Sequence, residues 1–572
     1  MNRIFTNPIN LLALLFIIVV GAWLAYLPNF VAGKLQSAIA KQTGREVQIK
    51  GGAGLVLSPR LGVALYKVEL TGSYALAKPV VDAQSMVVPI DFSTLITGQF
   101  APDTYYVDDA DIAVTINGEG HSNVSIDVNP DGAKGDAAAE APQPTKLTLS
   151  NSRLHFSDER DGTEFSVANI SGDAQIFANG EFDFGGTASA NEQFATVNAS
   201  LNSLARLFED GSPLDLNVDG DAGSISFNGQ ISTKGSLNLA GQADVSAVDT
   251  QLFARWLGID FEGLFNKQKL SLSGPVETKG TDIKFNKAEF QLGEMHGKGN
   301  ITFSNLNDRP LLSAELGMDK IDLSSFKPTA NGNLNAEWSD KPFSAQNFAA
   351  LDVKLSLSTN QLIYGSLKTG AATVETSLSN QHLTVELKSQ AIGAGSGDVN
   401  LDVNAAQRPF KTQAKFNFTN VESRDVLQAL FGINFVSGPA TFQAFLMTLG
   451  ESSADFISNL SGDATGEIKN GTVKGVDLSK VSALESDGWQ KAFTPSINAQ
   501  FRASFKDGVA KLDATKLRGI NFSLPIEGEV DLLRQSLNLA VPSKVKITGP
   551  WARPKIFPDL SSALKTAAPL RK

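Results

Sequence analysis

The 572-residue sequence contains no cysteine. Disulfide bonds, thiolate metal sites and cysteine nucleophiles are therefore excluded. Cations are also in deficit, because 49 Lys and Arg residues stand against 60 Asp and Glu residues and give a net charge of −11. Binding to nucleic-acid phosphates requires clustered cations, so this balance argues against a general nucleic-acid-binding protein.

Histidine is scarce as well. The four histidines are His121, His155, His296 and His382. No two of them have the spacing of metal ligands on one helix or hairpin, so each is expected to be an isolated surface or edge residue. Because no nucleophile–base pair is recognisable either, the sequence predicts no catalytic residue, no cofactor and no metal. The protein is expected not to be an enzyme.

Three polar segments resemble ligand-binding motifs only in part. The acidic segments 108–111 and 217–221 lack the residue spacing of an EF-hand calcium loop. We interpret the first as a solvated strand end. Gly393, Gly395 and Gly397 resemble a phosphate-binding loop, but Asp398 occupies the place of the third glycine and no helix follows. This segment is therefore predicted to be a flexible turn.

The residues that are abundant favour β-structure. The chain has 50 Gly and 35 Phe, but only 6 Tyr and 5 Trp. Many turn residues and many apolar aromatic side chains are typical of sheets. A hydrophobic content of 42% makes global disorder implausible. A chain of this length is expected to form several domains or a long repetitive array.

One long apolar run lies near the N-terminus. The stretch from Ile9 to Leu27 is apolar apart from Asn10. As a helix it would span about 28 Å, close to the thickness of a bilayer core. A cleaved signal peptide is the alternative, but its apolar run is shorter and ends in small residues. We predict an uncleaved membrane anchor, and its representative residues are Ile9, Leu15, Val20, Trp23 and Leu27.

Strict alternation of apolar and polar residues recurs through the rest of the chain. The two clearest runs place apolar residues at Leu351, Val353, Leu355 and Leu357, and at Leu383, Val385 and Leu387. A period of two gives a strand one apolar face and one polar face. Turn signals such as Asn179-Gly180 and Asp507-Gly508 separate such runs, which predicts antiparallel hairpins.

Short helices and one linker interrupt this pattern. Leu252, Phe253, Trp256 and Leu257 are placed on one helical face, with Asp249 or Thr250 as the N-cap. Segment 426–431 has the same character 174 positions later, and segment 204–208 is a weaker third copy, so we interpret them as internal repeats. Residues 129–145, rich in Ala, Pro, Gly and Asp, are predicted to be a disordered linker.

Several phrases occur in a characteristic order behind the apolar run. They are Gly44-Arg45-Glu46-Val47, Pro59-Arg60-Leu61-Gly62, Ser152-Arg153-Leu154-His155-Phe156-Ser157-Asp158, Asn470-Gly471-Thr472-Val473-Lys474-Gly475-Val476-Asp477-Leu478 and Gly528-Glu529-Val530-Asp531-Leu532. In this order the chain resembles the AsmA family of Gram-negative envelope proteins over nearly its whole length. The resemblance gives a division into a membrane anchor (1–30), an AsmA-like N-terminal module (31–128), the linker (129–145), a β-rich middle region (146–420) and an AsmA-like C-terminal region (421–572).

The resemblance implies a single-pass anchor in the inner membrane, with the bulk of the chain in the periplasm. A local count of positive charges points the other way, because Lys34, Lys41 and Arg45 follow the apolar run while only Arg3 and the α-amino group precede it. The resemblance also implies outer-membrane biogenesis and lipid homeostasis, with membrane phospholipids and other envelope proteins as partners. The family looks related to chorein-type bridge-like lipid transfer proteins.

Two arrangements of the half-apolar strands remain open. An elongated, curled antiparallel sheet would form a groove with an apolar floor, and its candidate lipid-facing residues are Leu351, Val353, Leu355, Leu357, Leu383, Val385 and Leu387. A series of β-sandwiches would instead bury the apolar faces against one another, as a structural or regulatory scaffold requires. The seven cations between Val541 and Lys572 are either an exposed tail or a contact for anionic lipid head groups.

Deleting residues 1–27 and adding a cleavable export signal is expected to release soluble periplasmic protein, because the only long apolar run is removed. Fractionation after a salt wash measures this. A truncated chain that still sediments with the inner membrane would contradict a single anchor.

Overall fold

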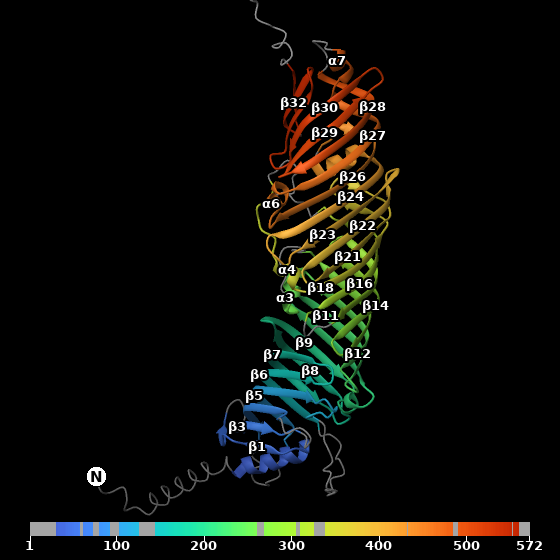
Figure 1. The fold of residues 1–572 in the computed structure, drawn as a ribbon. Coiled ribbons are helices and arrows are strands. Elements are labelled where there is room, and N and C mark those ends of the chain that lie inside the picture. Colours follow the sequence, from blue (N-terminus) through green and yellow to red (C-terminus); the bar gives the residue numbers. More distant parts are fainter. Residues whose placement is uncertain are drawn as a thin grey trace, which may run out of the picture. The chain divides into compact units, whose positions relative to one another are not determined.

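The computed structural model describes residues 30–57, 61–72, 79–91, 102–124, 144–259, 268–304, 309–324, 338–431, 433–483, 490–551 and 553–559 (Figure 1). They form two compact units. Unit 1 comprises the residues up to Ile259 and Phe265–Asn286, and unit 2 comprises Lys287–Phe303 and the chain from Arg309 onward. Each unit is built on a many-stranded sheet.

Unit 1 follows the order of the sequence. Its strands are β1 (Val47–Ile49), β2 (Ala53–Val56), β3 (Gly62–Leu70), β4 (Val81–Pro89), β5 (Thr104–Ile116), β6 (Thr145–Asp158), β7 (Thr163–Ile176), β8 (Phe182–Ala190), β9 (Gln193–Leu201), β10 (Ser212–Gly220), β11 (Gly223–Ser232), β12 (Asn238–Ala247) and β13 (Leu270–Lys279). β1 and β2 share one edge of β3, and every later strand pairs with the one before it. All these pairs are antiparallel except β5–β6, which is parallel.

A helix over residues 30–43 covers the first strands of unit 1. Its residues Val31, Leu35 and Ile39 recur every four positions and are buried against β1, β3, β4 and β5. Tyr105 of β5 fixes the other end of the helix, because its hydroxyl donates to Gln42 Oε1 at 2.6 Å. Burial raises the pKa of Tyr105 to about 12.

The helix α3 (Thr250–Trp256) confirms the predicted cap. The Asp249 carboxylate accepts hydrogen bonds from the backbone N–H groups of Gln251 and Leu252. Phe253 and Trp256 are buried against the ends of β9, β11 and β12. The prediction that Leu252 and Leu257 share that face is wrong, because both are exposed. The weaker third copy is a 3₁₀ helix, η1 (Ala205–Phe208).

A buried ion pair closes the turn between β6 and β7. The Asp158 carboxylate is fully buried and accepts from Arg160 Nε at 2.8 Å and from Arg160 Nη2 at 2.6 Å. Nη2 also donates to the carbonyl of Thr233, at 2.9 Å. The hydrogen bond to Asp158 raises the pKa of Arg160 above its usual value. The phrase that ends at Asp158 therefore has a structural role in this turn.

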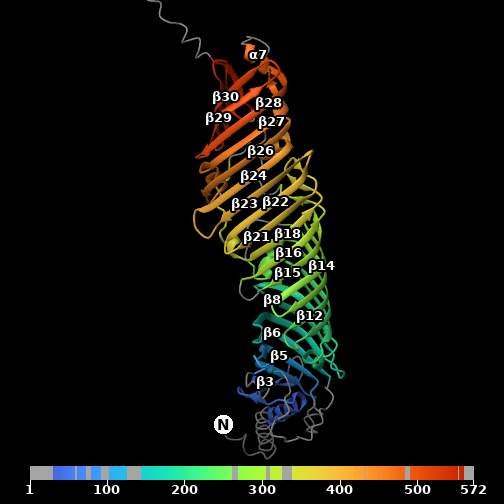
Figure 2. The same ribbon diagram turned by 45° about the vertical axis from the view of Figure 1, so that its right-hand side comes forward.

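Unit 2 contains the longer series of strands (Figure 2). They are β15 (Met295–Ser304), β16 (Leu311–Met318), β17 (Ile321–Asp322), β18 (Asp352–Thr359), β19 (Leu362–Tyr364), β20 (Leu367–Lys368), β21 (Ala372–Ser379), β22 (His382–Ile392), β23 (Gly395–Asn404), β24 (Phe410–Glu422), β25 (Val436–Ser437), β26 (Pro439–Gly450), β27 (Ser461–Val476), β28 (Gln490–Lys506), β29 (Val509–Arg518), β30 (Ser523–Asp531), β31 (Ser536–Val541), β32 (Val545–Pro550) and β33 (Lys555–Pro558). The strand β14 (Asp282–Leu292) contains the boundary between the units in the sequence.

The strands of unit 2 pair in a meander. From β18 through β21–β24 and β26–β33, each strand is antiparallel to the next. β16 and β18 are parallel, and β17, β19 and β20 form a small separate sheet. The helices of this unit are α4 (Gln346–Ala349), α5 (Ser423–Phe431), α6 (Ser453–Ser458) and α7 (Leu478–Ala483).

Two apolar cores lie at opposite strand ends of the last strands of unit 2. The first unites Val426 of α5 and Leu478 of α7 with residues as far apart in the sheet as Ile392 of β22 and Val545 of β32. Strands that are remote in the pairing order reach one cluster only if the sheet curls around its apolar side. The second core surrounds the buried Trp551, against Trp338, Ile457 and Phe505, among others.

A recurring bulge bends the strands of both units. At four mid-strand positions a residue adopts a positive φ, and its backbone N–H donates to a side-chain oxygen across the sheet. The pairs are Asn151 with Ser171, Lys287 with Asn300, Asn420 with Thr441 and Asn470 with Asn498, at 3.0–3.2 Å. A bulge adds one residue to its strand and increases the local twist, while the side-chain acceptor satisfies the displaced N–H.

These observations confirm a mainly β protein with a curled sheet and few helices. The expected antiparallel order is interrupted at β5–β6 and β16–β18, which are parallel. In each pair a long connection returns the chain to the end of the sheet at which the first strand began. Among the described residues, no helix is both long enough and apolar enough to span a membrane. The anchor residues Ile9, Leu15, Val20, Trp23 and Leu27 lie outside the described residues, as does the predicted linker up to residue 143. Thr145, its last residue, already begins β6.

Replacing Asp158 with Ala is expected to destabilise unit 1 by about 3 kcal/mol, because the Arg160 guanidinium is left without its carboxylate in a largely buried site. The urea midpoint measures the loss. Asp111→Ala is the matched control, since Asp111 makes an equally short contact with Arg153 at an exposed position. Equal midpoints for the two variants would contradict the assignment.

Candidate functional site

The register of unit 2 brings both predicted apolar runs onto one face of the sheet. Val353, Leu355 and Leu357 of β18 are opposite Leu378, Thr376 and Val374 of β21. The same three β21 residues are opposite Leu383, Val385 and Leu387 of β22. Residues directly opposite one another share a face, so the two runs are separated by one strand only. Leu351 precedes β18 and is outside the ladder.

The same face extends across neighbouring strands in continuous rows. One row runs from β16 to β26 through Leu316, Leu357, Val374, Leu387, Val399, Phe416 and Ala444. The row beside it runs through Ala314, Leu355, Thr376, Val385, Leu401, Ala414 and Leu446. We call the surface made by these two rows and the predicted runs the apolar face.

The predicted residues of the apolar face are only half-buried. Val353, Leu355 and Leu357, and likewise the three leucine and valine residues of β22, keep part of their surface accessible to solvent. In a sandwich core such side chains would be fully buried by a second sheet. On the same face Leu316, Val374 and Leu378 are buried. Full burial is also found near the covering elements, where α5 and α7 contribute Val426 and Leu478 to the core around Ile497 and Leu524. The apolar face therefore retains capacity to bury further apolar surface.

The opposite face of the same strands is polar and paired. Ser356 Oγ donates to Glu375, and Lys388 Nζ lies 2.6 Å from Glu386. The hydrogen bond to Glu386 raises the pKa of Lys388. A hollow of about 580 Å³ on this side is lined mainly by charged and amide side chains of β18 and β21–β24. Water solvates this face, so the two faces of the sheet differ sharply in polarity.

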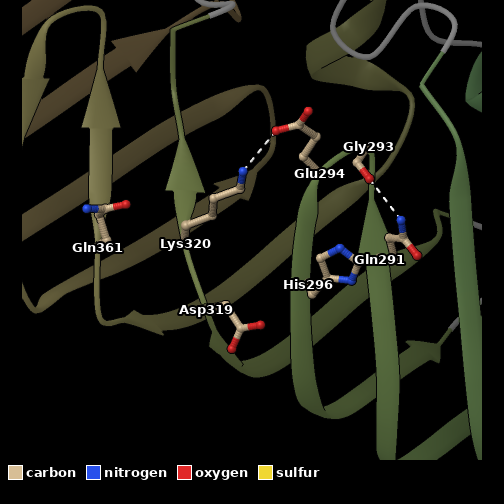
Figure 3. Close-up of a pocket in the computed structure, with 7 residues that line it drawn as sticks. All are labelled: Gln291, Gly293, Glu294, His296, Asp319, Lys320 and Gln361. Carbon is tan, nitrogen blue, oxygen red and sulfur yellow. Dashed lines mark hydrogen bonds and ion pairs between the residues drawn. The ribbon is translucent and has the colours of Figure 1, made fainter.

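A second hollow, also of about 580 Å³, lies at the ends of β14–β16 (Figure 3). Its lining is polar: Gln291, Gly293, Glu294, His296, Asp319, Lys320 and Gln361. Lys320 Nζ donates to Glu294 at 2.9 Å, which lowers the pKa of that carboxyl group. Gln291 Nε2 donates to the carbonyl of Gly293 at 3.0 Å. These two contacts pair Lys320 with Glu294 and Gln291 with Gly293.

The weak motifs of the sequence have structural explanations. Asp109 and Asp111 lie beside Arg153, which contacts them at 3.6 and 2.6 Å. Within the described residues, no group of three acidic or histidine side chains is arranged to hold a metal ion. The predicted flexible turn is wrong beyond Gly393, because Gly395 begins β23 and Gly397 lies inside that strand. A side chain at 397 would collide with the ring of Phe418.

The sequence interpretation missed much of the apolar face. The residues that belong to the same rows but were not predicted as lipid-facing include Ala314 and Leu316 of β16, Val374 and Thr376 of β21, and Ala414 and Phe416 of β24. Alternation is present in each, yet Thr376, Ala314 and Ala414 weaken it. Only the register shows that these small residues lie between larger apolar ones on one face.

Comparison with models of protein families shows a similarity that covers most of the chain. A model of the AsmA family matches residues 6–396 and, in a second overlapping match, residues 169–515. The strands β18, β21 and β22 lie inside both matched ranges. No curated protein and no solved structure matches the chain.

Replacing Leu355 with Ala is expected to cost about 1 kcal/mol, because a half-exposed leucine loses little burial. Leu524→Ala makes the same chemical change at a fully buried position of the same unit and is expected to cost about 3 kcal/mol. Urea midpoints of the unit 2 transition give both values. Similar costs at the two positions would mean that the apolar face is a closed core.

Proposed function

Since the chain belongs to the AsmA family, we propose that it carries phospholipids between membranes of the cell envelope, along the apolar face of its sheet. It acts in outer-membrane biogenesis and lipid homeostasis. The N-terminal apolar run anchors it in the inner membrane, and the bulk of the chain lies in the periplasm. The reaction is transfer without bond making or breaking, so the protein is not an enzyme and requires no cofactor.

The observation that carries this proposal is the apolar face of β16–β24, on which the predicted residues of β18 and β22 are half-buried. Its rows continue from strand to strand without an intervening charge, through Leu357, Val374, Leu387 and Val399. Burying apolar surface is worth about 25 cal/mol per Å², or ~0.8 kcal/mol for each methylene group. An acyl chain laid across these rows would gain that energy, while its head group stays in water.

This form of binding has a consequence for selectivity. Contacts with acyl chains are driven by area and have no donor or acceptor that distinguishes one lipid from another. The polar face, with paired side chains such as Ser356–Glu375 and Lys388–Glu386, keeps the opposite side of the sheet in solvent. We therefore expect broad acceptance of phospholipid chains.

A structural or regulatory scaffold for outer-membrane assembly is the second candidate. It is favoured by the closed cores around Ile497 and Trp551, which are packed as in an ordinary β-protein. A scaffold needs no accessible apolar surface, whereas a carrier does. The state of the apolar face therefore discriminates between the two functions.

The double substitution Val353→Asp and Leu355→Asp tests the proposal. It places two carboxylates on the apolar face, where loss of hydration makes an unpaired charge very costly. Mass spectrometry of phospholipids that co-purify with the detergent-extracted protein is expected to show a large loss of bound lipid. A thermal melt of the same sample is expected to show that the fold survives, because the face is not a closed core.

Lys354→Gln with Ser356→Asn is the matched control on the same strand, since both residues alternate with the first pair. It should alter neither lipid content nor melting. Unfolding of the Asp variant, together with a parent protein that carries no lipid, would overturn the carrier proposal and support the scaffold.

A further inference from the structure

The rim of unit 2 near α7 exposes three large apolar side chains, two on different strands and one in a turn. Phe493 at the start of β28 is 62% exposed, Ile520 in the turn after β29 is 82% exposed, and Phe557 of β33 is 50% exposed. All three lie at the same end of the strands, because their neighbours in the sequence or in the ladder belong to one core. These neighbours are Leu478, Ile497, Leu517, Leu524 and Val545. Isolated exposed apolar residues are common, but three at one rim require an explanation.

A cation accompanies each of these apolar side chains. Lys474 is the ladder partner of Phe493, and Lys546 is the ladder partner of Phe557. Arg518 stands two residues before Ile520 and is itself exposed. Three described anions lie nearby. The Asp477 carboxylate accepts hydrogen bonds from Ser479 and Lys480 at the start of α7. Glu527 is opposite Ala540 in the next strand pair, and Asp559 is nearly buried and 3.9 Å from Lys546.

Exposed apolar side chains beside cations are typical of protein surfaces that bind the interface of a lipid bilayer. Apolar tips enter the boundary between head groups and acyl chains, and lysine and arginine keep their charges at the level of anionic head groups. Protein–protein interfaces are depleted of lysine, whereas two of the three cations here, Lys474 and Lys546, are lysines. The acidic balance of the whole chain, −11, makes this local cation excess stand out.

We propose that the α7 rim, defined by Phe493, Ile520 and Phe557 with Lys474, Arg518 and Lys546, docks on the surface of an anionic lipid bilayer. The rim is separate from the apolar face, so this contact goes beyond lipid carriage and does not depend on it. Of the cations at the end of the sequence, Lys546 belongs to the rim, whereas Arg553 lies in the turn at the other end of β32.

The absence of native cysteine allows a direct test in the full chain. Ile520→Cys carries an environment-sensitive dye, and the protein is held in nanodiscs of phosphatidylcholine. Vesicles with 30% phosphatidylglycerol are then added, with pure phosphatidylcholine vesicles as the comparison. The expected result is a blue shift and a several-fold rise in emission with the anionic vesicles only, reduced by added salt.

Leu533→Cys is the matched control. Leu533 is similar in size to Ile520 and is 44% exposed, but it lies in the β30–β31 turn, at the opposite end of the strands. Its dye should not respond. An equal response at both positions, or none at position 520, would overturn the proposal.

Charge is tested separately with Lys474→Gln, Arg518→Gln and Lys546→Gln combined. Each cation near an anionic surface contributes a factor of about five in affinity, so the triple variant is expected to bind the anionic vesicles up to roughly 100-fold more weakly. Lys506→Gln with Arg534→Gln, at the opposite end, should change nothing. Binding that is unaltered in the triple variant would also overturn the proposal.

Failure of the docking proposal can be distinguished from failure of the carrier proposal. Lipid content per protein should be normal in the triple variant, because the apolar face is untouched. A rim that docks on vesicles while the parent protein carries no lipid would refute carriage alone. The reverse result would refute docking alone.

Discussion

The structure depends on one constraint, which is that a strand with alternating apolar and polar residues has a face that water does not solvate. A single-layer sheet must cover that face with something other than a second sheet. In unit 1 the helix 30–43 and α3 provide cover over the first strands and over the ends of β9–β12. In unit 2 α5 and α7 do so for the core around Ile497. Over β18 and β22 the cover is incomplete, and the apolar side chains remain half-exposed. The candidate site is thus the part of the sheet where the described residues do not fully cover the apolar face.

The bulges explain how a single sheet curls without losing backbone hydrogen bonds. A positive φ at Asn151, Lys287, Asn420 or Asn470 displaces one N–H from the ladder, and a hydroxyl or amide oxygen across the sheet accepts it. Asparagine tolerates this conformation better than most residues, and it occupies three of the four positions. A curl also requires close approach, as at Gly466, where an added side chain would meet the Cβ atom of Phe442 and the ring of Phe501. Curvature and an accessible inner face therefore come from the same small set of residues.

Much of this fold could be predicted from the sequence, because period-two alternation depends only on strand geometry. The strands at 353–357 and 383–387 were located correctly, and so was the cap of α3 at Asp249. The parallel pairs β5–β6 and β16–β18 could not be predicted, since nothing local fixes the strand end to which a long connection returns. The helix 30–43 has a recognisable signal in Val31, Leu35 and Ile39, and Gly44 with its positive φ ends it. It was not predicted, because its sequence directly follows the predicted anchor. Half-burial, on which the site depends, is a tertiary property that no single strand encodes.

Charge and apolar surface are distributed so that the proposed lipid carriage and the proposed docking need not compete. Along the apolar face no charged residue interrupts the rows, whereas on the polar face cations such as Lys388 are held by neighbouring carboxylates. At the α7 rim the cations adjoin apolar tips. Exposed charges interact little beyond a Debye length of about 8 Å at physiological salt. The acidic residues elsewhere on unit 2 therefore cannot cancel the attraction of the rim for an anionic surface, although they repel that surface wherever they approach it. A chain with a net charge of −11 would then meet an anionic bilayer in one orientation, with the rim foremost, and the direction of approach would follow from the charge pattern without any change of fold.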